Sequence, residues 1–147
     1  VKKNRKPNWF ERYRWFISSE NYLVIAGRDA QDNEFLVKRH TNKNDIFVHA
    51  DLHGAAVVVI KVQKDQIQDA SNLPVPIKTL HEAASFAICF SSAWDSHLTI
   101  PAYWVKMDQV LKTAPTGEYL SVGGFSIRGK KKFHSTSCSF TGNLCFV

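Results

Sequence analysis

The chain has 147 residues, 44% of them hydrophobic and 22% charged, which is the size and composition of one globular domain with a substantial core. No apolar run approaches the roughly 20 residues that a membrane-spanning helix needs, and residues 1–7 lack the apolar segment of a secretory signal. The formal net charge is +6, and its surplus lies in two short segments. Residues 1–14 hold six basic side chains and one acidic, and residues 128–132 hold four basic and none acidic. If the fold brings these segments together, they form an electropositive face for a polyanion.

Short β-rich runs separated by turn residues dominate the first 60 residues. Ser19-Glu20-Asn21 joins two of these runs and is typical of a hairpin turn. Gly27-Arg28-Asp29 follows as a bend, and 30–34 is predicted as a helical turn or loop. The strands predicted in this half are 14–18, 22–26, 46–49 and 55–60.

The strongest helical pattern follows a polar connection that ends in Pro74-Val-Pro76. Thr79 and Glu82 have the spacing of a capping box, and small apolar residues then recur at helical spacing up to Trp94. Further strands are predicted at 103–106, 110–112, 125–128 and 144–147. The pattern predicts a single α+β domain, with a largely antiparallel β-sheet of short strands and one long helix, about 79–94, packed on it.

The segment His49-Ala-Asp51-Leu-His53 offers three chemically active side chains at alternate positions. In an extended backbone they share one face, where imidazole and carboxylate are possible zinc or iron ligands. Two other interpretations are favoured, because no downstream residue supplies a fourth ligand. Either Asp51 accepts hydrogen bonds from loop N–H groups, or His49 and His53 face a nucleotide. Gly54 is expected to allow close approach of the chain to a neighbour.

Two further segments combine a cation with turn-forming residues. Arg28 and Asp29 form either a structural ion pair or a phosphate site in which Asp29 orients the guanidinium. The loop 112–118 lacks the GxxxxGK[ST] pattern, but its Lys, Thr and Gly residues suit either a phosphate cradle or a purely structural turn.

The remaining candidates favour structural roles. Trp15, Trp94 and Trp104 are expected in the core, although an exposed Trp would offer a stacking platform for a base. The three scattered cysteines include no CxxC pair and argue against a disulfide framework, and Cys89 is expected to be a buried, inert thiol. No GxSxG elbow or Cys–His pairing is readable, so the sequence predicts no catalytic residue.

Several long, ordered motifs carry a resemblance to a known family. They are the segment from Arg14 to Asp29, Asp45-Ile-Phe-Val-His-Ala-Asp-Leu-His-Gly-Ala55, Gln109-Val-Leu-Lys-Thr-Ala-Pro-Thr-Gly-Glu-Tyr119 and Gly124-Phe-Ser-Ile-Arg-Gly-Lys-Lys-Lys-Phe133. On these motifs, from about residue 9 to 133, the sequence resembles the NFACT-R domain of NEMF/RqcH-type ribosome-associated quality-control proteins. It departs from the family pattern at 62–73, which is longer and more polar, and after Phe133.

The resemblance implies a role in ribosome rescue. Proteins of this family bind the large ribosomal subunit while peptidyl-tRNA obstructs it, recruit or stabilise an E3 ubiquitin ligase, and support C-terminal tailing of the stalled nascent chain. Their tRNA-handling acid–Arg pair lies in an N-terminal domain that this sequence does not include. The first residue is not Met, and we expect a piece of a longer protein, with a basic lead-in at 1–8 and an RNA-binding domain at 9–147 whose C-terminal boundary is open after 133.

We therefore expect a non-catalytic, cytoplasmic RNA-binding domain without a cofactor or a metal. Its expected partners are the large ribosomal subunit and tRNA, with the E3 ligase reached through the full-length protein and no membrane. The alternatives are a module that docks a ribosomal protein or the ligase through exposed aromatic residues and, third, a metal-dependent nuclease. The predicted RNA-facing residues are Arg28, Lys38, His49, His53, Lys112, Thr116, Gly117, Arg128, Lys130, Lys131 and Lys132, with Asp29, Asp51 and Gly54 expected to be structural.

Overall fold

The computed structural model describes residues 4–52, 54–67, 73–91, 100–111 and 124–134 of the chain. The described part forms a six-stranded antiparallel sheet in the order β1-β2-β4-β3-β5-β8, together with a small sheet of β6 and β7. The strands are β1 (Arg14–Ile17), β2 (Leu23–Ala26), β3 (Ile46–Ala50), β4 (Val57–Lys61), β5 (Ala102–Lys106), β6 (Val110–Leu111), β7 (Ser126–Ile127) and β8 (Lys132–His134). The helices are α1 (Ala30–Arg39) and α2 (Ile77–Cys89), with 3₁₀ turns η1 (Trp9–Arg12), η2 (Lys64–Gln66) and η3 (Met107–Gln109).

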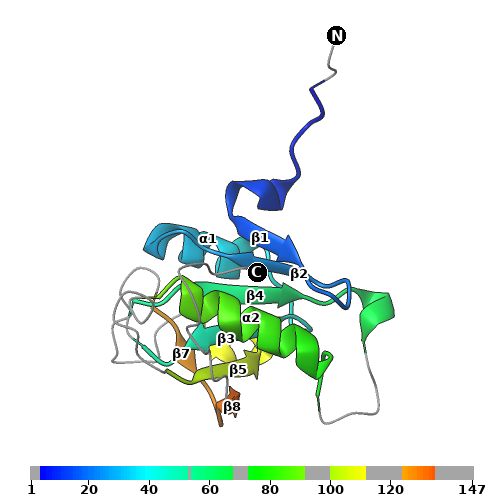
Figure 1. Cartoon of the computed structure of the whole chain (residues 1–147). Helices are drawn as coiled ribbons and strands as arrows, with labels where there is room; N and C mark the ends of the chain where they lie inside the picture. The colour runs from blue at the N-terminus through cyan, green and yellow to red at the C-terminus, as the bar shows by residue number, and fades with distance from the viewer. Residues whose placement is uncertain (1–3, 53, 68–72, 92–99, 112–123, 135–147) are drawn as a thin grey trace, which may run out of the picture.

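The central strands of the large sheet are buried on both faces. Helix α2 crosses one face, as Figure 1 shows, and packs on alternate strand residues such as Val48, Val58 and Trp104. The intervening residues, including Phe47 and Tyr103, turn to the opposite face and pack with Leu36 and Val37 of α1. The continuous apolar runs of β3 and β4 follow from this arrangement, because both of their faces are covered.

Helix α1 is longer than the sequence predicts. A single ten-residue helix replaces the expected short turn at 30–34, and Asp29 caps it by accepting a hydrogen bond of 2.8 Å from the N–H of Asp32. Gly27 lets this helix approach the sheet, because a Cβ at that position would lie 2.0 Å from Asn33 Oδ1. The N-terminus of α1 is therefore held directly against the end of β2.

Helix α2 begins at Ile77, and the capping box predicted at Thr79 is wrong. Thr79 is fully buried and its hydroxyl lies 3.0 Å from that of Ser18, while Glu82 accepts a hydrogen bond of 3.0 Å from the N–H of Ser19. Both side chains thus tie the helix to the β1–β2 hairpin and leave its own N-terminus uncapped. The helix ends at Cys89 with Phe90 as its C-cap, so the predicted continuation through Phe90 and Ser91 is wrong, and positions 92–94 lie outside the described residues.

Asp45 is a fully buried carboxylate that fixes the entry to β3. It accepts hydrogen bonds from Lys61 Nζ at 2.6 Å, from the N–H of Val62 at 3.0 Å and from the N–H of Asn42 at 2.9 Å. A buried carboxylate needs such partners to offset its desolvation. Lys61 therefore has a structural role in holding β4 to this turn.

The α+β class, the hairpin at 19–21 and the antiparallel sheet of short strands are confirmed. Strand β8 was not predicted, and the predicted strand at 144–147 lies outside the described residues. Trp104 is buried as expected, but Trp15 on the edge strand is 41% exposed, so its predicted core position is wrong. Cys89 is partly buried and disulfide-bonded, which corrects the prediction of an inert thiol.

No helix in the described segments is long and apolar enough to cross a membrane.

Candidate nucleic-acid interface

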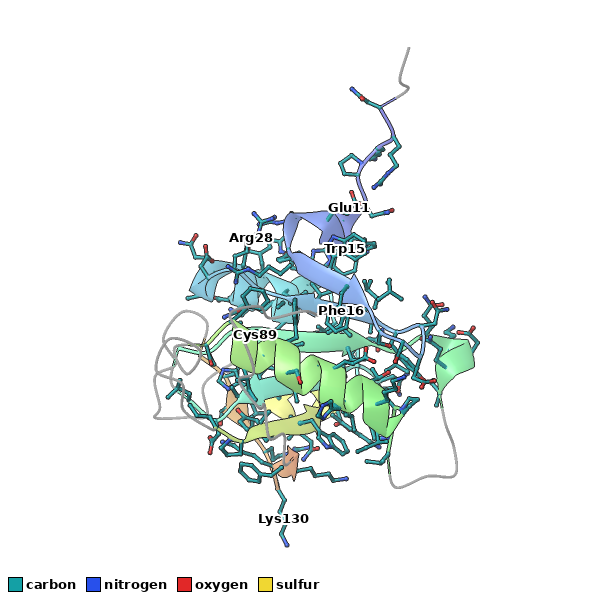
Figure 2. The ribbon with its side chains drawn as sticks, in the orientation of Figure 1. Glu11, Trp15, Phe16, Arg28, Cys89 and Lys130 are labelled. Atoms are coloured by element: carbon teal, nitrogen blue, oxygen red, sulfur yellow. The ribbon has the colours of Figure 1, made fainter. Side chains whose placement is uncertain are left out.

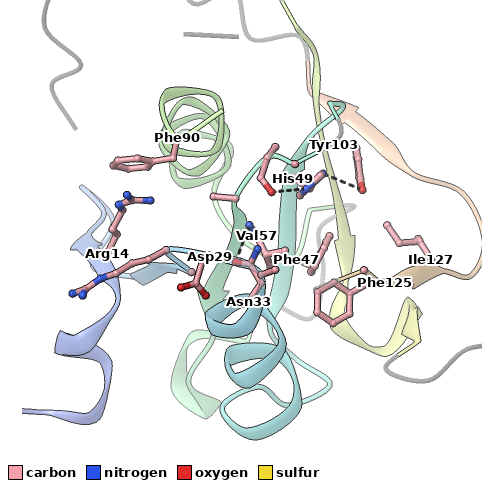
Figure 3. A pocket seen from close by; sticks show the side chains of 17 residues that line it. Arg14, Asp29, Asn33, Phe47, His49, Val57, Phe90, Tyr103, Phe125 and Ile127 are labelled. Carbon is pink, nitrogen blue, oxygen red and sulfur yellow. Dashed lines mark hydrogen bonds between the residues drawn. The ribbon is translucent and has the colours of Figure 1, made fainter. Parts of the chain in front are cut away.

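A cavity of about 410 Å³ lies mostly on the α1 side of the large sheet and extends past the strand ends to Phe90 at the end of α2 (Figure 3). Strands β3, β4 and β5 supply its floor, the β2–α1 turn one wall and the β6–β7 sheet another. Its described lining residues are Arg14, Gly27, Arg28, Asp29, Ala30, Asn33, Phe47, His49, Gly54, Ala55, Ala56, Val57, Phe90, Tyr103, Gly124, Phe125 and Ile127. The cavity therefore joins segments that are far apart in the sequence.

His49 lies at the floor of the cavity in a fixed orientation. Its Nε2 lies 3.1 Å from the carbonyl oxygen of Ala55, and the Tyr103 hydroxyl lies 3.5 Å from its Nδ1. Since a carbonyl can only accept, Nε2 carries the proton and Nδ1 is the acceptor in the neutral ring. Burial lowers the pKa of His49, and the nearby positive charge of Lys131 lowers it further. His49 is therefore neutral near physiological pH and contributes an uncharged polar group to the floor of the cavity.

Tyr103 stands beside His49 because the two residues are paired in register between β3 and β5. Burial raises the pKa of Tyr103 to about 12, so its hydroxyl keeps its proton. The Tyr103 O–H can donate to His49 Nδ1, and the hydroxyl oxygen can still accept a hydrogen bond from a ligand.

The opposite end of the cavity carries two arginines. The guanidinium of Arg14 lies 4.2 Å from the ring centroid of Phe90, and Figure 3 shows this pair across the cavity from Tyr103. Arg28 lies at the exposed start of the β2–α1 turn (Figure 2). Neither arginine makes an ion pair among the described residues. The predicted ion pair of Arg28 with Asp29 is absent from this part of the chain, because the Asp29 carboxylate caps α1.

The cationic segment 128–132 does not present its side chains in one direction. Lys131 Nζ lies 4.3 Å from the centroid of the Tyr103 ring, on the cavity face of the sheet. Lys132 lies 4.7 Å from the centroid of the Trp104 ring, and Trp104 belongs to the α2 face. Lys130 projects away from the sheet (Figure 2). Arg128 is exposed, and its N–H donates to the Gln109 carbonyl at 2.7 Å. Lys131 is thus the lysine that adjoins His49.

Lys38 does not line the cavity. It lies in the last turn of α1 and forms an ion pair with Glu34 one turn earlier. Its charge is therefore compensated locally, and its position on the helix gives no reason to include it in the same site.

The loop after β3 differs from the predicted extended face. The strand ends at Ala50, and the N–H of Asp51 donates to the Pro101 carbonyl at 2.9 Å while the chain turns. Asp51 is exposed and its carboxylate accepts no hydrogen bond from the described residues, so its predicted role as an acceptor for loop N–H groups is not supported. No group of three His, Cys, Asp or Glu side chains in the described segments is placed to hold a metal.

Gly54 has a positive φ of 82°, which L-residues rarely adopt, and a Cβ there would meet no atom within 4 Å. The expectation that it allows a close approach is therefore wrong, and its role is to turn the chain at the cavity edge. His53, Lys112, Thr116 and Gly117 of the predicted site lie outside the described residues.

The sequence prediction missed several residues of the cavity, among them Arg14, Phe90, Tyr103 and Phe125. Arg14 was counted in the basic segment 1–14 without a spatial position. The three aromatic residues gave no signal, because an apolar residue in a strand or helix looks the same whether it faces the core or a cavity.

The fold and this basic, aromatic cavity agree with a match to a protein family. The profile of the family described as NFACT protein RNA binding domain matches residues 12–129, which includes most of the described part of the chain. The chain belongs to this family of RNA-binding domains.

The relatives give the family a context. The chain is 54% identical over 133 residues to the human ribosome quality control complex subunit NEMF, covering 90% of the chain and 12% of that protein. It is 54% identical over 147 residues to the NEMF homolog of Drosophila melanogaster, covering all of the chain and 14% of that protein. The archaeal Rqc2 homolog aRqcH of Methanocaldococcus jannaschii is 41% identical over 135 residues, covering 91% of the chain and 18% of that protein. The chain thus spans between 12% and 18% of the length of these relatives.

A solved structure shares the fold. The C-terminal part of the fibronectin/fibrinogen-binding protein from Streptococcus suis superimposes with a TM-score of 0.64 at 20% identity, covering 89% of this chain and 47% of that one. At this identity the likeness concerns the fold alone.

Proposed function

We propose that this domain binds RNA on the large ribosomal subunit for a ribosome quality-control factor, at a stage when peptidyl-tRNA still obstructs that subunit. Membership of the RNA-binding family and the names of the relatives support this role. In the full-length protein, the domain would contribute to recruitment of an E3 ubiquitin ligase and to C-terminal tailing of the nascent chain. It acts in the cytoplasm and without catalysis of its own.

The observation that carries the proposal is the convergence of Arg14, Arg28 and Lys131 around one cavity. Arg14 and Arg28 line it, and Lys131 lies over the ring of Tyr103, which is also a lining residue. None of these three cations forms an ion pair within the described segments, and Asp29 is the single acidic residue among the described lining residues. Uncompensated arginine and lysine side chains around one cavity are suited to the phosphates of RNA.

The proposal predicts salt-dependent binding that depends on Lys131 more than on its neighbour. We expect the affinity of the 147-residue chain for tRNA or ribosomal RNA to fall by about tenfold or more between roughly 50 and 200 mM salt. Lys131→Ala should weaken binding and reduce the slope of log affinity against log salt by about 0.7–0.9. Lys130→Ala is the matched control, because it removes an equal charge from the adjacent residue that projects away from the sheet.

Fluorescence anisotropy titrations of both variants provide the measurement. Equal losses for Lys130→Ala and Lys131→Ala would show that the cavity face is not the RNA site. A flat salt response of the wild-type chain would contradict phosphate binding altogether.

A protein-docking function is the second candidate, and exposed aromatic residues favour it. Trp9, Trp15 and Ile17 are 43%, 41% and 50% exposed, and they lie on η1 and on the edge strand β1. Such a surface could receive a ribosomal protein or the ligase. On this alternative, Trp15→Ala abolishes assembly with the ribosome, while Lys131→Ala leaves it intact.

A further inference from the structure

We infer that the cavity between α1 and β5 holds one unstacked nucleotide of single-stranded RNA, with its base at the aromatic end and its phosphate at the arginine end. The inference rests on the proposed function and specifies the ligand of that same site. It adds recognition of single-stranded RNA to a domain for which we have proposed phosphate contacts alone.

The size and shape of the cavity suit a ligand of this kind. Its volume of about 410 Å³ falls in the roughly 300–1,000 Å³ range of small-ligand pockets. A nucleotide has a flat apolar base at one end and a charged phosphate at the other. The cavity has the same polarity, since Figure 3 shows Arg14 on one side and Phe47, Tyr103, Phe125 and Ile127 on the other.

The aromatic end can hold a base by its face and by its edge. Phe125 is partly buried and packs edge-on against Phe47, with ring centroids 6.1 Å apart, so that it forms a firm apolar wall. RNA-binding proteins commonly hold unstacked bases against such aromatic walls. Tyr103 and the neutral His49 supply the polar edge, and the Tyr103 oxygen keeps an acceptor site for an N–H group of a base.

The arginine end can hold the phosphate of the same nucleotide. The Arg14 guanidinium lies against the Phe90 ring, which restricts its position, and Arg28 stands at the start of the β2–α1 turn. Arginine forms paired hydrogen bonds to phosphate oxygens. A base inside a double helix cannot enter the cavity without leaving its pair, so the geometry selects single strands, loops and bulges.

Ala30 offers a way to close the cavity without removing a charge or a core residue. It is the first residue of α1, is exposed, and lines the cavity. Gln31 is the next residue, is also exposed, and does not line the cavity. Ala30→Trp and Gln31→Trp therefore form a matched pair, in which one indole fills the cavity mouth and the other points elsewhere on the helix.

The test compares the binding of a six-nucleotide single-stranded RNA, its blunt duplex and adenosine 5′-monophosphate. We expect the wild-type chain to bind the single strand at least about tenfold more tightly than the duplex or the mononucleotide. Ala30→Trp should lose about tenfold in affinity for the single strand and leave duplex binding within about twofold, while Gln31→Trp should match the wild type. If Ala30→Trp does not fold, a second pair of variants tests the same point. Phe125→Ala removes the aromatic wall of the cavity, and Phe35→Ala is its control, because Phe35 is exposed on α1 and is not among the described lining residues.

The outcomes separate this inference from the function on which it rests. Single-strand binding that is equal in Ala30→Trp and Gln31→Trp, with salt dependence retained, would overturn the nucleotide pocket and leave RNA binding intact. Mononucleotide binding as tight as that of the RNA would reassign the pocket to a free nucleotide and overturn the inference. A wild-type chain that binds none of the RNAs would contradict the proposed function itself.

Discussion

The sequence identifies His49 as a candidate functional residue, but the fold determines which hydrogen bonds its two ring nitrogens make. The motif around it suggested a metal ligand or a contact to a nucleotide. In the structure its Nε2–H donates to Ala55 and its Nδ1 faces the Tyr103 hydroxyl, so both nitrogens are oriented by neighbours. The sequence could not show this, because the pairing of β3 with β5 joins residues 54 positions apart.

The lowered pKa of His49 predicts a pH-dependent stability. Burial lowers this pKa below the usual value of 6.5, so the unfolded chain binds a proton at a higher pH than the folded chain. The stabilising contribution is complete above pH 6.5, decreases as the pH falls through that value, and stops changing below the folded-state pKa. Between pH 7.5 and 5.5, we expect the free energy of unfolding to decrease less in the His49→Gln chain than in the wild-type chain.

Urea denaturation at several pH values measures this effect, and NMR titration of the His49 ring gives its pKa directly. His40 also has a pKa lowered by burial, so a residual slope should persist in the His49→Gln chain. A His49 ring that titrates above 6.5 in the folded chain would contradict the buried, neutral imidazole.

Among the elements, α1 positions the wall of the cavity, and Gly27 determines how closely it can approach. The Asn33 side chain occupies the space that a Cβ at Gly27 would need, and its Oδ1 lies 3.4 Å from the N–H of Val57. This contact joins the helix to both β2 and β4. Arg28 and Asp29 follow Gly27 directly, so their positions depend on the same contact.

Gly27→Ala should therefore destabilise the fold and disturb the RNA site together. We expect a loss of about 2 kcal/mol in the free energy of unfolding, as is usual for overpacking a tight contact. Adding Asn33→Ala should recover part of the loss, because it removes the 2.0 Å contact with Oδ1 and leaves the 2.8 Å contact with the backbone nitrogen. Thermal and urea unfolding of the single and double variants provide the test. A Gly27→Ala chain with an unchanged free energy of unfolding would contradict the close approach of α1 to Gly27.

Local patterns in the sequence were sufficient to predict most strands but did not predict the helix boundaries. Runs such as 57–60 are apolar and β-branched, and such runs suit a strand buried on both faces. Thr79 and Glu82 have the spacing of a cap, but tertiary hydrogen bonds to Ser18 and Ser19 use both side chains. The predicted helix start was two residues late because local spacing carries no information about such distant partners.

At the scale of the whole molecule, the sheet separates the cations that the sequence places together. Lys132 is the first residue of β8 and Lys131 precedes it directly, and the two side chains lie against Trp104 and Tyr103 on different faces of the sheet. Charge counting along the sequence correctly identified the cationic segment and could not assign these faces. The pairing of β5 with β8 was needed for that assignment, and β8 itself was not predicted.

The arrangement leaves two separate candidate surfaces on one domain. The cavity face combines Arg14, Arg28 and Lys131 with aromatic walls, whereas η1 and the edge strand β1 expose Trp9 and Trp15. An RNA ligand should contact the first surface, and a protein partner of the alternative function should contact the second. The position of bound RNA therefore decides between the two functions.

Ultraviolet crosslinking of the 147-residue chain to tRNA and to large-subunit RNA, followed by mass spectrometry of the linked peptides, tests the central claim most directly. Aromatic residues near bases crosslink without added reagents, so both surfaces can report contact. The account predicts crosslinks at Phe125 and Tyr103, reduced in the Arg28→Ala, Lys131→Ala chain. Crosslinks confined to Trp9 and Trp15, with the cavity residues unlinked, would contradict it.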